Sequence, residues 1–105
     1  MTALAAPMAI RRPKRSVVVR AGDARDDDLF ARQLLALLAE LGVETTYAGR
    51  NESAGSIASV AVEAHADTIE LCLGRGMGVK LLRDLLRELV ELGRRDVSIV
   101  VHRMD

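Results

Sequence analysis

The order of apolar and polar residues follows two different periods between residues 16 and 102. Four short segments are expected to be strands, and they lie at 16–20, 43–48, 67–73 and 96–102. The first is a β-branched run typical of a buried strand, and the second is expected to be exposed on one side. Three longer segments repeat apolar residues every three or four positions, as amphipathic helices do, and they lie at 26–41, 53–66 and 79–92. Strands and helices therefore alternate, which favours a parallel sheet with right-handed crossovers.

Two of the expected helices carry a broad apolar face. In the first helix the residues expected to face the core are Phe30, Leu34, Leu37, Leu38 and Leu41. In the last helix they are Leu82, Leu85, Leu86, Leu89 and Val90. Gly42 and Gly93 follow these helices and are expected to end them.

Composition limits the function classes. The chain has 105 residues, with 15 Lys and Arg against 15 Asp and Glu, and a pI near 6.7. No nucleic acid or membrane surface is expected as partner, because such binding needs a basic excess. One Cys and two His exclude an internal disulfide, make a metal site unexpected, and suit a cytoplasmic protein. Residues 1–15 hold four basic residues and no acid, and we expect a disordered basic arm before a single domain over 16–105.

Three segments resemble the cobalamin-binding domain of the methylmalonyl-CoA mutase family. They are Leu41 to Gly49, Ala66 to Ile69, and Glu91 to Val101. The resemblance covers about residues 15 to 102 and implies a flavodoxin-like α/β fold, with three layers and parallel strands. It implies the strand order 2-1-3-4, without the fifth strand and the last two helices of that family.

The same resemblance implies where a cofactor would bind. In the family, cobalamin is held by a His in an Asp-x-His-x-x-Gly loop after the first strand, by a Ser-x-Leu after the third strand and by a Gly-Gly after the fourth. The candidate cofactor-binding residues at these places are Asp23, Arg25, Asp27, Cys72, Gly74 and His102. None of the residues in the first loop is a His, so the chain is expected not to bind cobalamin through that ligand.

The resemblance therefore predicts a non-catalytic binding or assembly module derived from a cobalamin-binding domain, with no cofactor. Its partner would be a second copy or a mutase-like protein. The alternative is a cobalamin-binding small subunit or accessory chain of an acyl-CoA mutase, completed by a partner chain. An enzymatic role would then be a share in that cobalamin-dependent reaction.

Strands three and four each alternate an apolar with a mixed face. If no helix covers the mixed face, it would be lined by Thr68, Glu70, Cys72, Ser98 and His102. That face is open to three interpretations: a wet half-face, a surface for a second chain, or a ligand site. The apolar run from Val97 to Val101 would form an open edge that invites pairing with another strand.

Three further signals have simpler structural explanations. The acids Asp23, Asp26, Asp27 and Asp28 could bind a cation but also suit a helix start. The sequence Gly74-x-Gly76-x-Gly78 could seat a phosphate or form an ordinary loop. Cys72 could react if His102 on the next strand served as its base, or it could be an inert core residue.

Overall fold

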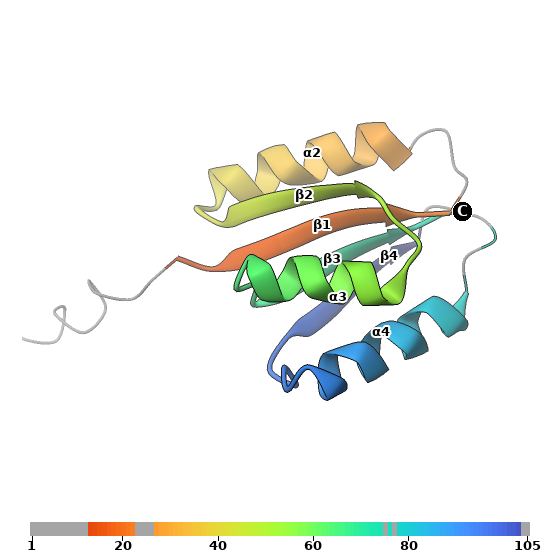
Figure 1. Ribbon diagram of the computed structural model, residues 1–105. Helices are drawn as coiled ribbons and strands as arrows, with labels where there is room; N and C mark the ends of the chain where they lie inside the picture. Colours follow the sequence, from red (N-terminus) through yellow and green to blue (C-terminus); the bar gives the residue numbers. More distant parts are fainter. Residues whose placement is uncertain (1–12, 23–26, 75, 77, 104–105) are drawn as a thin grey trace, which may run out of the picture.

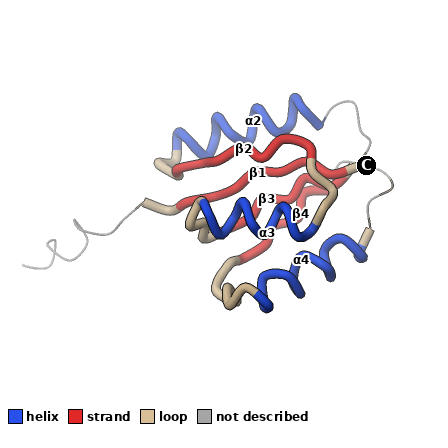
Figure 2. The backbone as a smooth tube through the Cα atoms, viewed as in Figure 1, coloured by secondary structure: helices blue, strands red, loops and turns tan. Residues whose placement is uncertain are grey.

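The computed structural model describes residues 13–22, 27–74, 76 and 78–103, which form three layers. A four-stranded sheet carries α2 on one face and both α3 and α4 on the other (Figures 1 and 2). The strands are β1 (Arg15–Ala21), β2 (Glu44–Arg50), β3 (Thr68–Leu73) and β4 (Ser98–Arg103). The helices are α2 (Asp27–Glu40), α3 (Ala54–Glu63) and α4 (Val79–Glu91).

All strand pairs are parallel, in the order β2-β1-β3-β4. This confirms the expected flavodoxin-like layout. Of the expected basic arm, residues 1–12 lie outside the described residues, whereas Arg15 is already the first residue of β1.

Most of the core lies between the sheet and the helices α3 and α4. Alternate residues of β1 and β3 point to this side, here called the α3–α4 face, and pack with helix residues such as Ile57 and Leu85, both fully buried. The opposite side, the α2 face, holds a smaller core of Val18, Ala31 and Cys72. The alternation read from the strands thus places one wholly apolar face under two helices.

Strand β2 runs farther than expected. Gly49 and Arg50 were expected in a loop, but β2 continues to Arg50, which pairs with Arg20 of β1. The register shifts between Val18 and Arg20, and Gly49 has φ of 68°, a conformation that glycine adopts at little cost. A β-bulge therefore carries the strand past the expected turn.

Helix α3 starts as expected and ends earlier. The Ser53 hydroxyl accepts a hydrogen bond from the Ser56 N–H at 3.3 Å, which confirms Ser53 as the N-cap. The helix stops at Glu63 because the chain turns at the exposed His65, with φ of 53°, and the Ala66 N–H bonds back to the Ala61 carbonyl.

Helices α2 and α4 bury narrower faces than their periodicity predicted. In α4 the buried row is Leu81, Leu85 and Leu89, whereas Leu86 and Val90 are 49% and 46% exposed. Leu37 of α2 and Leu41, which follows the end of that helix, are exposed as well. Leu86 and Val90 each follow a buried leucine by one residue, a rotation of about 100° about the helix axis. The sequence pattern therefore predicted the helix correctly but assigned part of its buried face wrongly.

Candidate functional site

Polar residues meet on the α2 face near the carboxyl ends of three strands. Arg20 of β1 is opposite Cys72 of β3, and Cys72 is opposite His102 of β4. Glu70 lies two residues before Cys72, so its side chain points to the same face. These four residues form what we call the polar cluster. Cys72 and His102 were expected to be neighbours, and the register confirms it.

Glu70 and His102 bond to each other across β3 and β4. His102 Nε2 and Glu70 Oε1 are 2.7 Å apart, and the side chains are 24% and 11% exposed. The His102 ring also lies against Phe30 of α2, with ring centroids 5.4 Å apart. An ionised carboxylate only accepts hydrogen bonds, so with Glu70 in that form the His102 Nε2–H is the donor of this contact.

The prediction that this polar face is open to solvent is therefore wrong for its central residues. Glu70 is 8% exposed and Cys72 is fully buried, whereas Ser98 is exposed. The physical reason is that His102 of β4 bonds to the Glu70 carboxylate, and the His102 ring in turn lies against Phe30 of α2. Only the outer part of this face, toward β4, stays open.

The thiol has no route to a substrate. Cys72 has no exposed surface and packs with Val18 and Ala31. Reaction requires an accessible thiolate. His102 is its neighbour, but the Nε2 atom of that ring is engaged with Glu70. The core role of Cys72 fits these contacts better than nucleophilic chemistry does.

Arg20 adds a polar atom that no sequence signal singled out. Its Nε is buried and has no hydrogen-bond partner among the described residues. A charged residue at the carboxyl end of a central parallel strand was the signal that could have marked it. Phe30 was expected only as a core residue, and its contact with His102 joins segments that are far apart in the sequence.

The six candidate cofactor residues have different outcomes. Asp23 and Arg25 lie outside the described residues, and Asp27 is the first residue of α2. The buried Gly74 donates its backbone N–H to the Ala21 carbonyl at 2.7 Å. Cys72 and His102 belong to the polar cluster. Cys72 is fully buried there, and the Nε2 atom of His102 is bonded to Glu70. These contacts decide nothing about cobalamin: its absence as a His-ligated cofactor stays a prediction, and its binding stays the alternative.

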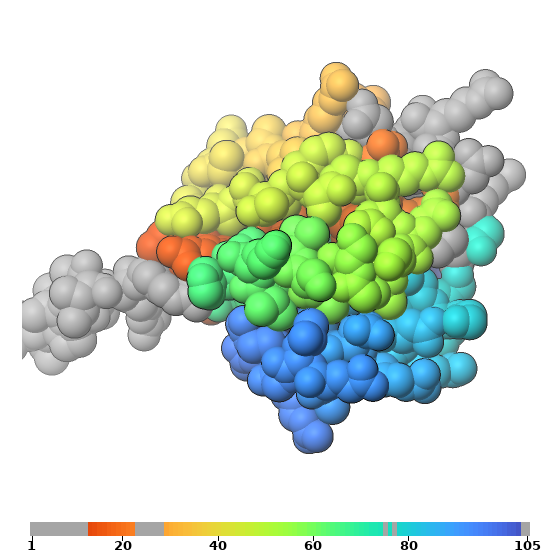
Figure 3. Space-filling view, in the orientation of Figure 1, coloured from red at the N-terminus to blue at the C-terminus, as the bar shows by residue number. Residues whose placement is uncertain are grey.

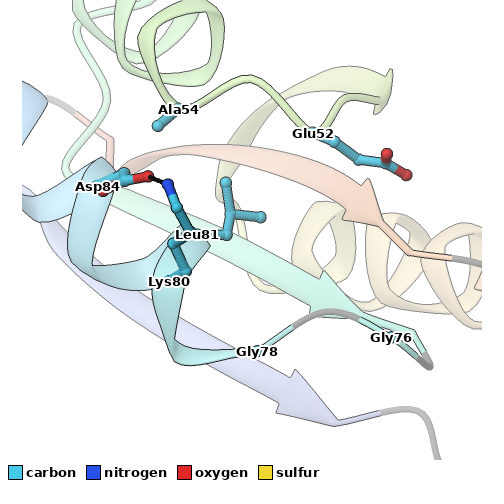
Figure 4. A pocket seen from close by; sticks show the side chains of 7 residues that line it. All are labelled: Glu52, Ala54, Gly76, Gly78, Lys80, Leu81 and Asp84. Carbon is cyan, nitrogen blue, oxygen red and sulfur yellow. Dashed lines mark hydrogen bonds and ion pairs between the residues drawn. The ribbon is translucent and has the colours of Figure 1, made fainter.

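A pocket of about 250 Å³ opens on the other face of the sheet, where α3 and α4 begin (Figure 4). It is lined by Glu52, Ala54, Gly76, Gly78, Lys80, Leu81 and Asp84. Lys80 Nζ lies 2.6 Å from Asp84 Oδ2, and this hydrogen bond lowers the pKa of the Asp84 carboxyl below its usual 3.8. Glu52 accepts a hydrogen bond from the Gly22 N–H at 3.1 Å.

The charges of this pocket do not favour a phosphate. The Lys80 ammonium is already paired, and the carboxylates of Glu52 and Asp84 would repel an anion. The phosphate interpretation of the glycine loop also depends on Arg75 and Met77, which lie outside the described residues. Of the four acids considered for a cation, Asp23 and Asp26 lie outside too, and the described residues contain no metal-binding group of three His, Cys, Asp or Glu.

The third candidate surface is the free edge of β4. The Ser98 N–H donates to the Asp67 carbonyl, so Ser98, Val100 and His102 turn their backbone groups toward β3. By alternation, Ile99, Val101 and Arg103 direct their N–H and C=O groups away from the sheet. Val100 and Val101 are 41% and 37% exposed, one on each face.

Comparison with known proteins adds no name to these surfaces. No protein-family model matches this chain, and neither does any curated protein. Among the helices that the structure describes, none is both long and apolar enough to cross a membrane.

Proposed function

We propose that this chain is a non-catalytic assembly module that pairs the free edge of β4 with an extended strand of a second polypeptide. The observation that carries the proposal is the contrast between the two edges of the sheet. Edge strands are a risk of unwanted pairing, and proteins protect the edges that must stay single with charges, bulges or prolines.

Edge β2 has such protection. The bulge beside Gly49 bends the strand out of regular register, and this is what distinguishes it, because both edge strands end in an arginine and have uncharged central residues. Such a strand offers a poor template for a further strand.

Strand β4 has no charge, bulge or proline in its first four positions. Ser98, Ile99, Val100 and Val101 are uncharged, three of them are β-branched and apolar, and the pairing with β3 is regular throughout. The backbone groups of Ile99 and Val101 therefore suit strand addition, in which main-chain hydrogen bonds supply affinity and alternate side chains supply specificity. The burial of Cys72 agrees with a module that has no catalytic thiol.

The test is a titration of the full chain with a peptide of residues 98–103, followed by amide NMR. We expect the largest shift changes at the amides of Ile99, Val101 and Arg103, with β2 unaffected. At about 1 mM peptide, binding of roughly 4 kcal/mol is detectable. In excess, the peptide also displaces a copy already bound there.

The matched control changes one outward amide of the protein. Val101→Pro removes an N–H that points away from β3, so it blocks edge pairing and spares the hydrogen bonds of the sheet. This variant is expected to fold and to lose the peptide response. If the wild-type chain shows no response at β4, the proposed function is wrong.

A further inference from the structure

We infer that the strand which pairs with β4 belongs to a second copy of this chain, and that the two copies form a two-fold dimer in which α4 packs beside α4. This inference rests on the proposed function and names its partner. Two separate features of the molecule point to it: the side-chain order along β4 and the exposed apolar row of α4.

The side chains of β4 are complementary to themselves in one antiparallel register. A two-fold axis perpendicular to the sheet keeps each face on its own side, so Val100 can lie opposite Val100 of the second copy. Ile99 then lies opposite Val101, and Ser98 lies opposite His102. Cross-strand pairs of β-branched residues are favourable. A register centred on Val101 would instead place Ile99 opposite Arg103.

The backbone agrees with this register. Ile99 and Val101 are the residues whose N–H and C=O groups point outward, and the register makes them partners. They form hydrogen-bonded pairs, whereas Val100 sits in a non-hydrogen-bonded pair, in which Cα atoms lie about 4.5 Å apart. No like charges face each other among these residues.

Helix α4 carries an apolar row that the described residues leave largely uncovered. This row, here called the α4 stripe, consists of Val79, Leu82, Leu86 and Val90. Three of its members are 46% to 66% exposed and Leu82 is half-buried. A row of this kind on a small domain marks an interaction surface.

The α4 stripe faces the β4 side of the molecule. Asp84 and Glu88 face α3: Asp84 shares the pocket with Ala54, and the Glu88 carboxylate lies beside Gly55. Leu86 and Val90 each follow one of these acids by two residues, a rotation of about 200° about the helix axis, so they point away from α3. Figure 3 shows α3 and α4 in contact, and in Figure 1 the strand beyond β3 on that side is β4.

The α4 stripe and β4 also coincide in height along the sheet. Helix α4 begins and β4 ends at the carboxyl edge of the strands. Leu86 is seven residues into the helix, or about 10 Å at 1.5 Å per residue. Val100 is three residues before the end of β4, also about 10 Å at 3.3 Å per residue. One axis through the Val100 pair would therefore place the two Leu86 side chains near each other on the α3–α4 face.

The experiment places one new thiol at the proposed axis. In a Cys72→Ala chain, Val100→Cys is expected to form a disulfide-linked dimer under mild oxidation, because a Cα separation of about 4.5 Å lies within disulfide geometry. Thr46→Cys, in the same background and on the exposed part of β2, is the matched control and should stay monomeric. Circular dichroism checks that each variant is folded.

A second pair of variants tests the helix without touching the strand. Leu86→Lys should raise the dimer dissociation constant at least tenfold in sedimentation equilibrium. Leu37→Lys, on α2 and 51% exposed against 49% for Leu86, should leave it unchanged. Equal effects of the two substitutions would contradict the two-fold arrangement.

The outcomes separate this inference from the proposed function. A wild-type chain that stays monomeric at about 1 mM but binds the strand peptide would overturn the second copy as partner and keep the assembly module. A dimer that forms no Val100 disulfide, or that persists with Val101→Pro, would overturn the β4 interface. A monomer that ignores the peptide would overturn both.

Discussion

Single residues decide how the sheet tolerates a charge in its interior. Glu70 is 8% exposed on a central strand, and burying a carboxylate is costly unless it is paired. His102 supplies the hydrogen bond between β4 and β3, and its ring also contacts Phe30 of α2. The polar cluster is thus a structural link to the edge strand.

His102→Ala should destabilise the fold by about 1–3 kcal/mol, because it leaves the Glu70 carboxylate buried without this partner. Replacing both residues, Glu70→Leu with His102→Leu, should cost less than that single substitution, since no unpaired charge is then left. Urea unfolding of these two variants, and of Glu70→Leu and His102→Leu alone, gives the free energies to compare. If the double substitution costs the sum of the single ones, the pair is not coupled.

Sequence reasoning could place Glu70 on the correct face of β3 but not judge its burial. Alternation along a strand is a local property, and it correctly separated Ile69, Leu71 and Leu73 from Glu70 and Cys72. The partner of the buried Glu70 is His102, which comes from a distant part of the chain and itself contacts Phe30. No spacing in the sequence reports such contacts.

At the scale of one element, α4 shows the same division between local pattern and tertiary contact. Its apolar residues cover two adjacent rows, and the sequence could not say which row meets the core. The position of α3 and the sheet decides it: Leu81, Leu85 and Leu89 are buried, and the α4 stripe is left outside. The helix itself and its ends were predictable, because Gly93 lies just beyond Glu91.

Two alanine substitutions in neighbouring positions of α4 test which of its apolar rows is buried. In the Val101→Pro background, Leu85→Ala should lower the free energy of unfolding by about 2–5 kcal/mol, as expected for a fully buried leucine. Leu86→Ala should lower it by less than about 1 kcal/mol, since half of that side chain is already in water. Denaturant unfolding compares them. Similar losses would show that α4 buries a different row.

On the scale of the whole molecule, charge is balanced and the proposed interface is neutral. The chain has as many acidic as basic residues, and the central residues of β4 and of the α4 stripe carry no charge. Association should then be driven by apolar contact and backbone hydrogen bonds, with little contribution from long-range electrostatics.

The dimer dissociation constant should therefore change less than about threefold between roughly 0.05 and 0.5 M salt, over which the Debye length falls severalfold. Sedimentation equilibrium across this range measures it, with the Leu86→Lys variant for comparison. A steep loss of association with salt would mean that charged residues, rather than β4 and α4, form the contact.

The bulge in β2 has a consequence for the size of any particle the chain can build. Each copy offers one regular edge and one irregular edge, so joining two regular edges leaves only irregular ones outside. Growth by strand addition then stops at two subunits, because a closed two-fold contact uses the same patch on both partners. A kink near Gly49 would thus separate a finite complex from an endless fibre.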